Sequence, residues 1–170
     1  MHTLIAAIVY AETKEDAETE AKEVFDQLCT NDNYFDWHDS PERRWGIQPD
    51  ALPIYSQESK ELIKRLLGYT KQSFCESVEN IRKILAAYDT KKLYRARDEN
   101  PEGHFRYLCS CVGEDIGPHI RLYNPDGGGI REPKHLGYVL RKWDCLDGYK
   151  GDKNPYKNLS IWLVPRDIHY

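Results

Sequence analysis

Leu4-Ile-Ala-Ala-Ile-Val-Tyr10 is the apolar stretch from which the fold of this chain can be worked out. It is continuously apolar and partly β-branched, and its length suits a β-strand that is buried on both faces. It is much shorter than the roughly 20 apolar residues that a membrane-spanning helix needs. No basic segment precedes it, so it does not resemble a signal peptide. We therefore predict a central strand at residues 4–10 and no membrane segment.

The residues after this strand predict a helix. Thr13 can cap its N-terminus, and Asp16 stands where a capping box has its acidic residue. Apolar residues then recur at helical spacing, and charged residues fill the positions between them. These apolar residues are Ala17, Ala21, Val24, Phe25 and Leu28. The pattern predicts a helix over residues 14–29.

A mainly helical region is predicted next. Residues 30–55 are irregular, with a short strand at 34–39 as an option. Ser56 can cap a second helical segment, and apolar residues recur with a helical period over 57–88. This stretch is either one long helix or two helices broken near 68–70, and Gly68, which costs about 1 kcal/mol relative to alanine inside a helix, favours a kink or break. This segment has more apolar residues than one buried helix face can hold, so we also consider that the protein self-associates through it.

Two strands, a helix and a last strand are predicted in the second half. Residues 104–112 alternate between apolar and polar, and 119–123 resemble a second strand, so the two should form a hairpin. Pro133 suits the first position of a helix. The final strand, Leu159 to Val164, should end at Pro165, because proline cannot donate a hydrogen bond to a sheet.

This order of elements predicts an α+β fold. Without residues 30–103 the order is β-α-β-β-α-β, that of the ferredoxin-like or split βαβ fold, with an antiparallel or mixed sheet covered by helices. The region at about 30–103 is then a mainly helical insertion into one domain spanning residues 1–170, a length that fits a single domain. The main alternative is another α+β sandwich with a mixed sheet.

The composition is that of a soluble globular protein, with 40% hydrophobic and 31% charged residues. The five cysteines are scattered, which favours reduced thiols and a cytoplasmic location. The net charge of −4 conceals an asymmetry: residues 1–90 carry 10 basic and 17 acidic residues, whereas 91–170 carry 14 and 11. An anionic ligand is therefore expected in the second half, while the overall acidity disfavours a nucleic-acid duplex.

The segment from His119 to His135 has the pattern of a site for a small anion. A strand leads into a glycine-rich loop, and a helix begins just after it. Glycines let backbone N–H groups approach an anion, a helix N-terminus attracts negative charge, and basic side chains strengthen both effects. The predicted ligand-binding residues are Arg121, Tyr123, Gly127, Gly128, Gly129, Arg131, Lys134 and His135. The segment matches neither the Walker A pattern nor the dinucleotide fingerprint, so a structural turn is the alternative.

Two further groups of residues are candidate sites. Cys109 and Cys111 would share one face of a strand, where packing is a simpler interpretation than zinc binding. His38 lies between Asp36 and Asp39, which suits acid–base or metal chemistry but also an ordinary polar loop.

Two functions remain open on the sequence alone. The first is a binding or regulatory module, without a cofactor, that recognises a small phosphate-bearing ligand or a protein partner. The alternative is a small metal-independent phosphodiesterase or nuclease, with His119 and His104 facing each other across the hairpin as base and acid. Arg121 and Tyr123 would assist them.

Overall fold

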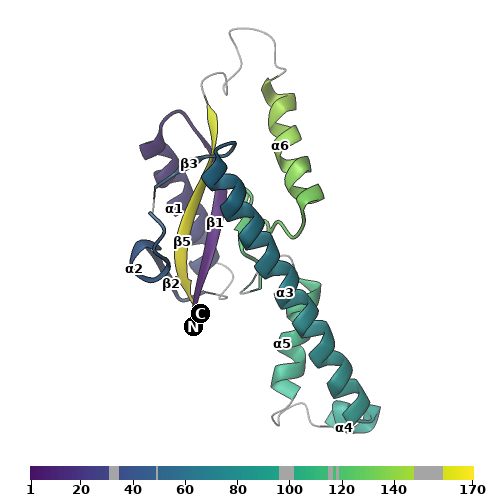
Figure 1. The fold of residues 1–170 in the computed structure, drawn as a ribbon. Helices are drawn as coiled ribbons and strands as arrows, with labels where there is room; N and C mark the ends of the chain where they lie inside the picture. The colour runs from purple at the N-terminus through teal and green to yellow at the C-terminus, as the bar shows by residue number, and fades with distance from the viewer. Residues whose placement is uncertain (31–34, 49, 96–101, 115–116, 118, 148–158) are drawn as a thin grey trace.

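The computed structural model describes residues 1–30, 35–48, 50–95, 102–114, 117, 119–147 and 159–170 (Figure 1). The elements are β1 (His2–Ala11), α1 (Lys14–Thr30), β2 (Trp37–Asp39), α2 (Glu42–Trp45), β3 (Leu52–Pro53), α3 (Gln57–Ala87), α4 (Thr90–Arg95), α5 (Glu102–Gly113), β4 (Leu122–Tyr123), α6 (Pro133–Asp147) and β5 (Ser160–His169). No helix in this described part has the length and apolar character to cross a membrane.

The sheet is mixed, and β1 lies inside it as predicted. The strand order is β2-β5-β1-β4, and the short β3 also pairs with β5. The strands β1 and β5 are antiparallel along their whole length, from the pair His2 and His169 to the pair Ala11 and Ser160. On its other side β1 runs parallel to β4, with Ala6 opposite Leu122. The fold is therefore α+β with a mixed sheet.

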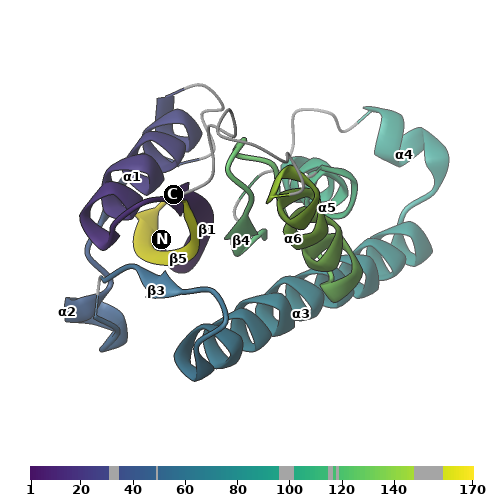
Figure 2. The same ribbon diagram turned by 90° about the horizontal axis from the view of Figure 1, so that it is seen from above.

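Helices cover both faces of the sheet, which explains why β1 is apolar throughout. On one face, Ile5 packs with Phe25 of α1. On the other face, Ile8 packs with Leu66 of α3 and with Val139 of α6. Figure 2 shows α1 on one side of β1 and β5, and α3 and α6 on the other. The prediction of a strand buried on both faces is confirmed.

Both predicted helix caps form. Thr13 Oγ1 accepts a hydrogen bond from the backbone N–H of Asp16 at 3.1 Å and donates to the Asp16 carboxylate at 2.7 Å. Ser56 Oγ accepts from the N–H of Ser59 at 3.1 Å at the start of α3. Each cap satisfies an N–H group that would otherwise lack a partner in the first turn.

The helix α3 is continuous, so the predicted break at Gly68 is wrong. Gly68 is exposed, and a Cβ added to it would meet nothing within 4 Å. The residues on either side of it, Leu66, Leu67 and Thr70, are buried. Their packing outweighs the cost of about 1 kcal/mol for an interior glycine. Figure 1 shows α3 projecting past the sheet, with α5 beside its far part.

The predicted hairpin is wrong, because its first strand is the helix α5, which packs against α3. The residues of this segment alternate between apolar and polar, and they also fit a helical period. Leu108 and Cys111, three positions apart, are buried, whereas Tyr107 and Cys109 are exposed. The projecting part of α3 supplies the surface that favours the helix. The ferredoxin-like order is therefore not confirmed, and the strand order differs from it.

The last strand does not end at Pro165 as predicted; it continues for four more residues, to His169. Ala6, the partner of Pro165, directs its N–H away from β5 and donates to the Arg121 carbonyl at 2.9 Å. Ala6 and Pro165 are therefore a non-hydrogen-bonded pair, and the proline nitrogen faces the opposite edge. On that edge of β5, the strand β3 pairs with Trp162 and Leu163, and β2 pairs with β5 from Asp167 onward. Pro165 lies between these two paired stretches, so its missing N–H removes no hydrogen bond of the sheet.

Candidate functional site

The glycine-rich loop after β4 is held together by its own hydrogen bonds. Asn124 Oδ1 accepts from the N–H groups of Asp126 and Gly128, both at 2.9 Å. The N–H of Gly127 donates to the Asn124 carbonyl at 3.0 Å, and Gly127 has a φ of +77°, which favours glycine. Gly129 forms a bridge with Tyr123. Three of the N–H groups that could have faced an anion are thus used inside the loop.

The other predicted ligand-binding residues are distributed between the core and the surface. Tyr123 is fully buried, and its hydroxyl lies within hydrogen-bonding distance of the carbonyls of Gly117 and Ile120, at 3.2 and 3.4 Å. Lys134 is exposed and His135 is half-buried in the first turn of α6. Tyr123 therefore braces the turn before β4 from inside the core.

Arg121 and Arg131 come together with His119, and we call these three residues the basic cluster. The guanidinium charges of both arginines act on the His119 imidazole. His119 is only 2% exposed, and both arginines are half-buried. The three side chains come from the segment before β4 and from the segment just before α6. The basic cluster thus joins two parts of the chain on either side of the loop.

Backbone contacts fix the basic cluster in place. His119 Nε2 donates to the Glu114 carbonyl at 3.0 Å. Arg131 Nη1 donates to the Val112 carbonyl at 3.1 Å, near the C-terminus of α5, where cations are favoured. The Arg121 N–H donates to the Thr70 hydroxyl of α3 at 3.2 Å. The positions of the cluster are therefore set by α3 and α5.

Several polar atoms of the basic cluster are buried and unpaired. Arg121 Nε and Nη1 and His119 Nδ1 have no hydrogen-bond partner among the residues that the structure describes. Leaving such a group unpaired costs about 1–3 kcal/mol, and more if it is charged. Unpaired buried groups are rare in native proteins, and their known explanations are strain, a catalytic role, or a bound water or ion.

The charges in the basic cluster are held in an unfavourable environment. Burial lowers the pKa of the Arg121 guanidinium, and the tyrosines around it, Tyr170 first, act in the opposite direction. Burial also lowers the pKa of His119, and the charge of Arg131 adds to this effect. An anion bound here would relieve both effects, because it would supply a counter-charge in a poorly solvated place.

The predicted facing of His104 and His119 across a hairpin is wrong, because no hairpin forms there and His104 belongs to the helix α5. Its side chain lies outside the described residues. Cys109 and Cys111 do not share a face either, because one thiol is exposed and the other is buried. Among the described residues, no group of three or more His, Cys, Asp or Glu could hold a metal ion.

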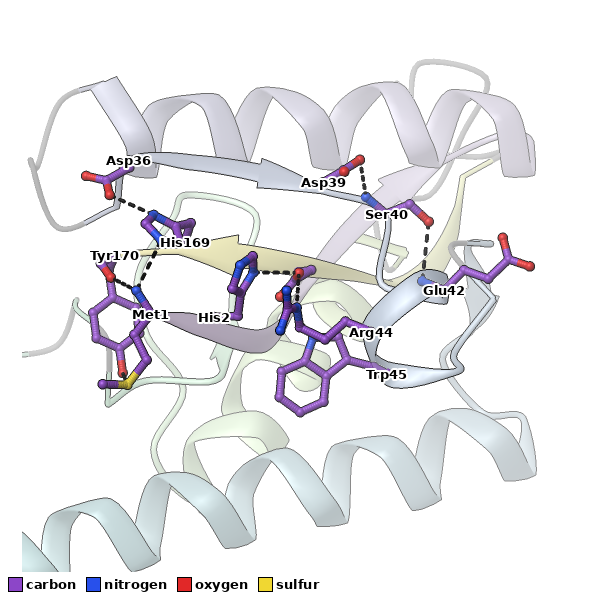
Figure 3. A network of polar contacts seen from close by, with 11 residues as sticks. Met1, His2, Asp36, Asp39, Ser40, Glu42, Arg44, Trp45, His169 and Tyr170 are labelled. Carbon is purple, nitrogen blue, oxygen red and sulfur yellow. Dashed lines mark hydrogen bonds and ion pairs between the residues drawn. The ribbon is translucent and has the colours of Figure 1, made fainter.

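A second polar cluster lies at the end of the sheet where β1 begins (Figure 3). Asp167 is buried and accepts from Trp45 Nε1 and His2 Nδ1, both at 2.9 Å. Arg44 Nε lies 3.5 Å from the same carboxylate. These contacts attach α2 to the strands β1 and β5. The Asp167 carboxylate therefore has hydrogen-bond partners, whereas Arg121 Nε and Nη1 have none among the described residues.

A row of rings extends from this carboxylate across three strands. Trp37 stacks on His169 with ring centroids 5.3 Å apart, and His2 lies edge-on to both rings. His169 Nδ1 bonds the exposed Asp36 carboxylate at 2.7 Å. The register of β2, β5 and β1 places the three rings side by side. The row thus joins the short edge strand β2 to the sheet.

His38 does not lie in the acid–base arrangement that its neighbours in sequence suggested. Its Nε2 bonds Asp26 of α1 at 2.8 Å, and its ring lies 5.6 Å from that of Phe25. The hydrogen bonds of His38 and then Lys22 lower the pKa of Asp26. This pair ties β2 to α1, a structural role.

Comparison with curated proteins and with solved structures finds no match to this chain. One family model, described as a domain of unknown function, matches residues 1–170. Because this match spans the full chain, the protein belongs to the family DUF7995.

Proposed function

We propose that this protein is a binding module for a small oxyanion, such as a phosphate group, and that the basic cluster is its site. One observation carries the proposal: the half-buried Arg121 guanidinium has two buried nitrogens, Nε and Nη1, without partners among the described residues. Phosphate oxygens are strong acceptors, and arginine is the side chain best suited to hold them.

The arrangement around Arg121 supports binding over catalysis. The residues that act on its charge are the tyrosines Tyr170, Tyr123 and Tyr107, and the Tyr170 side chain is also hydrogen-bonded to the guanidinium. Because neutral tyrosine hydroxyls are weaker acceptors than an anion, an oxyanion would bind the two remaining nitrogens, Nε and Nη1, without a competing negative charge from these side chains. With His104 in a helix, His119 has no second histidine facing it on a hairpin, and acid–base cleavage of a phosphodiester needs both roles. We therefore place a ligand, and not a reaction, at this site.

Thermal unfolding in a buffer of low ionic strength tests the proposal. Inorganic phosphate at 100 times its dissociation constant should add about 2.7 kcal/mol to the free energy of unfolding. For a chain of this length, that corresponds to a rise in Tm of about 5–10 °C. Arg121→Met should abolish the rise. The exposed Arg65, which donates to the Tyr69 hydroxyl, provides the matched control, and Arg65→Met should keep the rise.

The stability of Arg121→Met relative to the wild type, measured without phosphate, provides a second criterion. Methionine retains much of the apolar volume of Arg121 but removes a buried charge, so the variant should be as stable as the wild type or more stable. With phosphate the wild type should become the more stable of the two. A variant that is less stable than the wild type but shows the full rise with phosphate would mean that Arg121 has only a structural role. Equal phosphate responses of wild type and Arg121→Met would refute the proposed site.

A further inference from the structure

Resting on the proposed function, we infer that the basic cluster selects oxyanions that carry a proton, such as inorganic hydrogen phosphate, over those that carry none, such as sulfate. The proton is recognised by His119 Nδ1, and the remaining oxygens by Arg121. The selectivity follows from the position of the hydrogen on the imidazole ring of His119.

The hydrogen bond of His119 fixes this position. Its Nε2 lies 3.0 Å from the carbonyl oxygen of Glu114, and a carbonyl oxygen can only accept. Nε2 must therefore carry a hydrogen. In the neutral ring the other nitrogen, Nδ1, then has a lone pair and is an acceptor. That atom is buried and has no partner among the described residues.

The groups around His119 keep the ring neutral at neutral pH. Burial is the largest cause that lowers its pKa, and the charges of Arg131 and Arg121 act in the same direction. The backbone carbonyl and the carboxylate of Glu114 oppose them and do not outweigh them. The cluster therefore combines an acceptor, His119 Nδ1, with donors on Arg121, and all of them are buried.

Hydrogen phosphate satisfies both kinds of group at once. Its P–OH can donate to Nδ1, while its other oxygens accept from Arg121. Sulfate has no proton at pH 8, so one of its lone pairs would face that of Nδ1, or His119 would have to take a proton from solvent. A phosphodiester likewise has no proton to donate at pH 8. A phosphomonoester loses its last proton near pH 6, so it also lacks one at pH 8. A buried mismatch of this kind costs about 10- to 100-fold in affinity.

The selectivity should disappear on acidification. The pKa of His119 lies below the ordinary value of about 6.5, so the ring is neutral above that pH and gains its second proton only as the pH falls through the lowered pKa. The protonated ring then donates from Nδ1, and sulfate becomes an acceptable ligand.

Calorimetric titration with phosphate and with sulfate, at equal ionic strength, at pH 8 and at a series of values below pH 6.5, tests this inference. At pH 8 phosphate should bind about 10- to 100-fold more tightly than sulfate, and the ratio should fall toward one as the pH is lowered through the pKa of His119. His119→Phe keeps a ring but loses the acceptor, so it should bind both anions equally at pH 8. The matched control, His38→Phe, removes a histidine that pairs with Asp26 outside the cluster and should keep the selectivity.

The possible failures can be told apart. If both anions bind equally well at pH 8 and both need Arg121, the selectivity is overturned and the proposed function stands. If neither anion binds, the proposed function itself fails. Nitrogen-15 NMR of the imidazole gives a check that does not need a variant. It should show the hydrogen of His119 on Nε2 at pH 8, and a hydrogen on Nδ1 alone would overturn the inference.

Discussion

Replacing Asp167 by alanine should lower the free energy of unfolding by about 2–3 kcal/mol. The carboxylate is 4% exposed and holds the indole N–H of Trp45 and the Nδ1 of His2. Removing it leaves these donors without their acceptor. It also releases α2 from the sheet, because Trp45 belongs to that helix. Chemical denaturation of the variant and the wild type measures the difference.

Asp36 provides the matched control. It bonds His169 at 2.7 Å, so it is also one half of a histidine–aspartate pair, but its side chain is 64% exposed. Water can replace a lost contact there, and exposed ion pairs contribute only about 0–1 kcal/mol. Asp36→Ala should therefore cost much less than Asp167→Ala. Equal losses would contradict the view that Asp167 anchors this end of the sheet.

The thiols of Cys109 and Cys111 should differ at least 100-fold in their rate of alkylation under native conditions, because a buried thiol reacts only through opening. Cys109 is exposed on α5, whereas Cys111 is 2% exposed. Burial raises the pKa of Cys111, and its hydrogen bonds with Tyr107 and Ser77 oppose that shift without cancelling it. The reactive thiolate is therefore scarce as well as inaccessible.

Single-cysteine variants in denaturant provide the control, because both thiols should react there at similar rates. This experiment also tests the main correction to the fold. On a β-strand Cys109 and Cys111 would point to the same face and be similarly accessible. On the helix α5 they lie on different faces, so equal native rates would contradict the helix.

Local signals in the sequence predicted the elements that they control. Thr13 and Ser56 carry hydroxyls of the kind that cap helices, and both form the expected bonds. The uninterrupted apolar run of β1 required cover on both faces, and it has α1 on one face and α3 with α6 on the other. The caps depend only on residues close in sequence, and β1 depends on a long apolar run. Contacts with distant parts of the chain do not easily override either signal.

Elements decided by distant partners could not be predicted in this way. Gly68 is tolerated because buried residues around it hold α3 to the rest of the chain. The segment of α5 fits an alternating and a helical pattern equally well, and only the presence of α3 decides between them. Pro165 is compatible with a strand because β2 and β3 happen to leave a gap opposite it.

The candidate site was predicted in part, and it stays a prediction. The sequence singled out Arg121 and Arg131 from the charge asymmetry, and the structure places them around His119. It could not show that the glycine loop closes on Asn124 or that Tyr123 lies in the core. The sequence placed His119 and Arg131 in one candidate segment, but it could not show that the turn between β4 and α6 brings their side chains close together.

Equilibrium dialysis against radiolabelled inorganic phosphate, at pH 8 and low ionic strength, tests the central claim most directly. The wild type should bind one phosphate per chain at saturation. Arg121→Met should bind none, and Arg65→Met should bind one. The claim would be contradicted if the wild type bound no phosphate, or if Arg121→Met bound as much as the wild type.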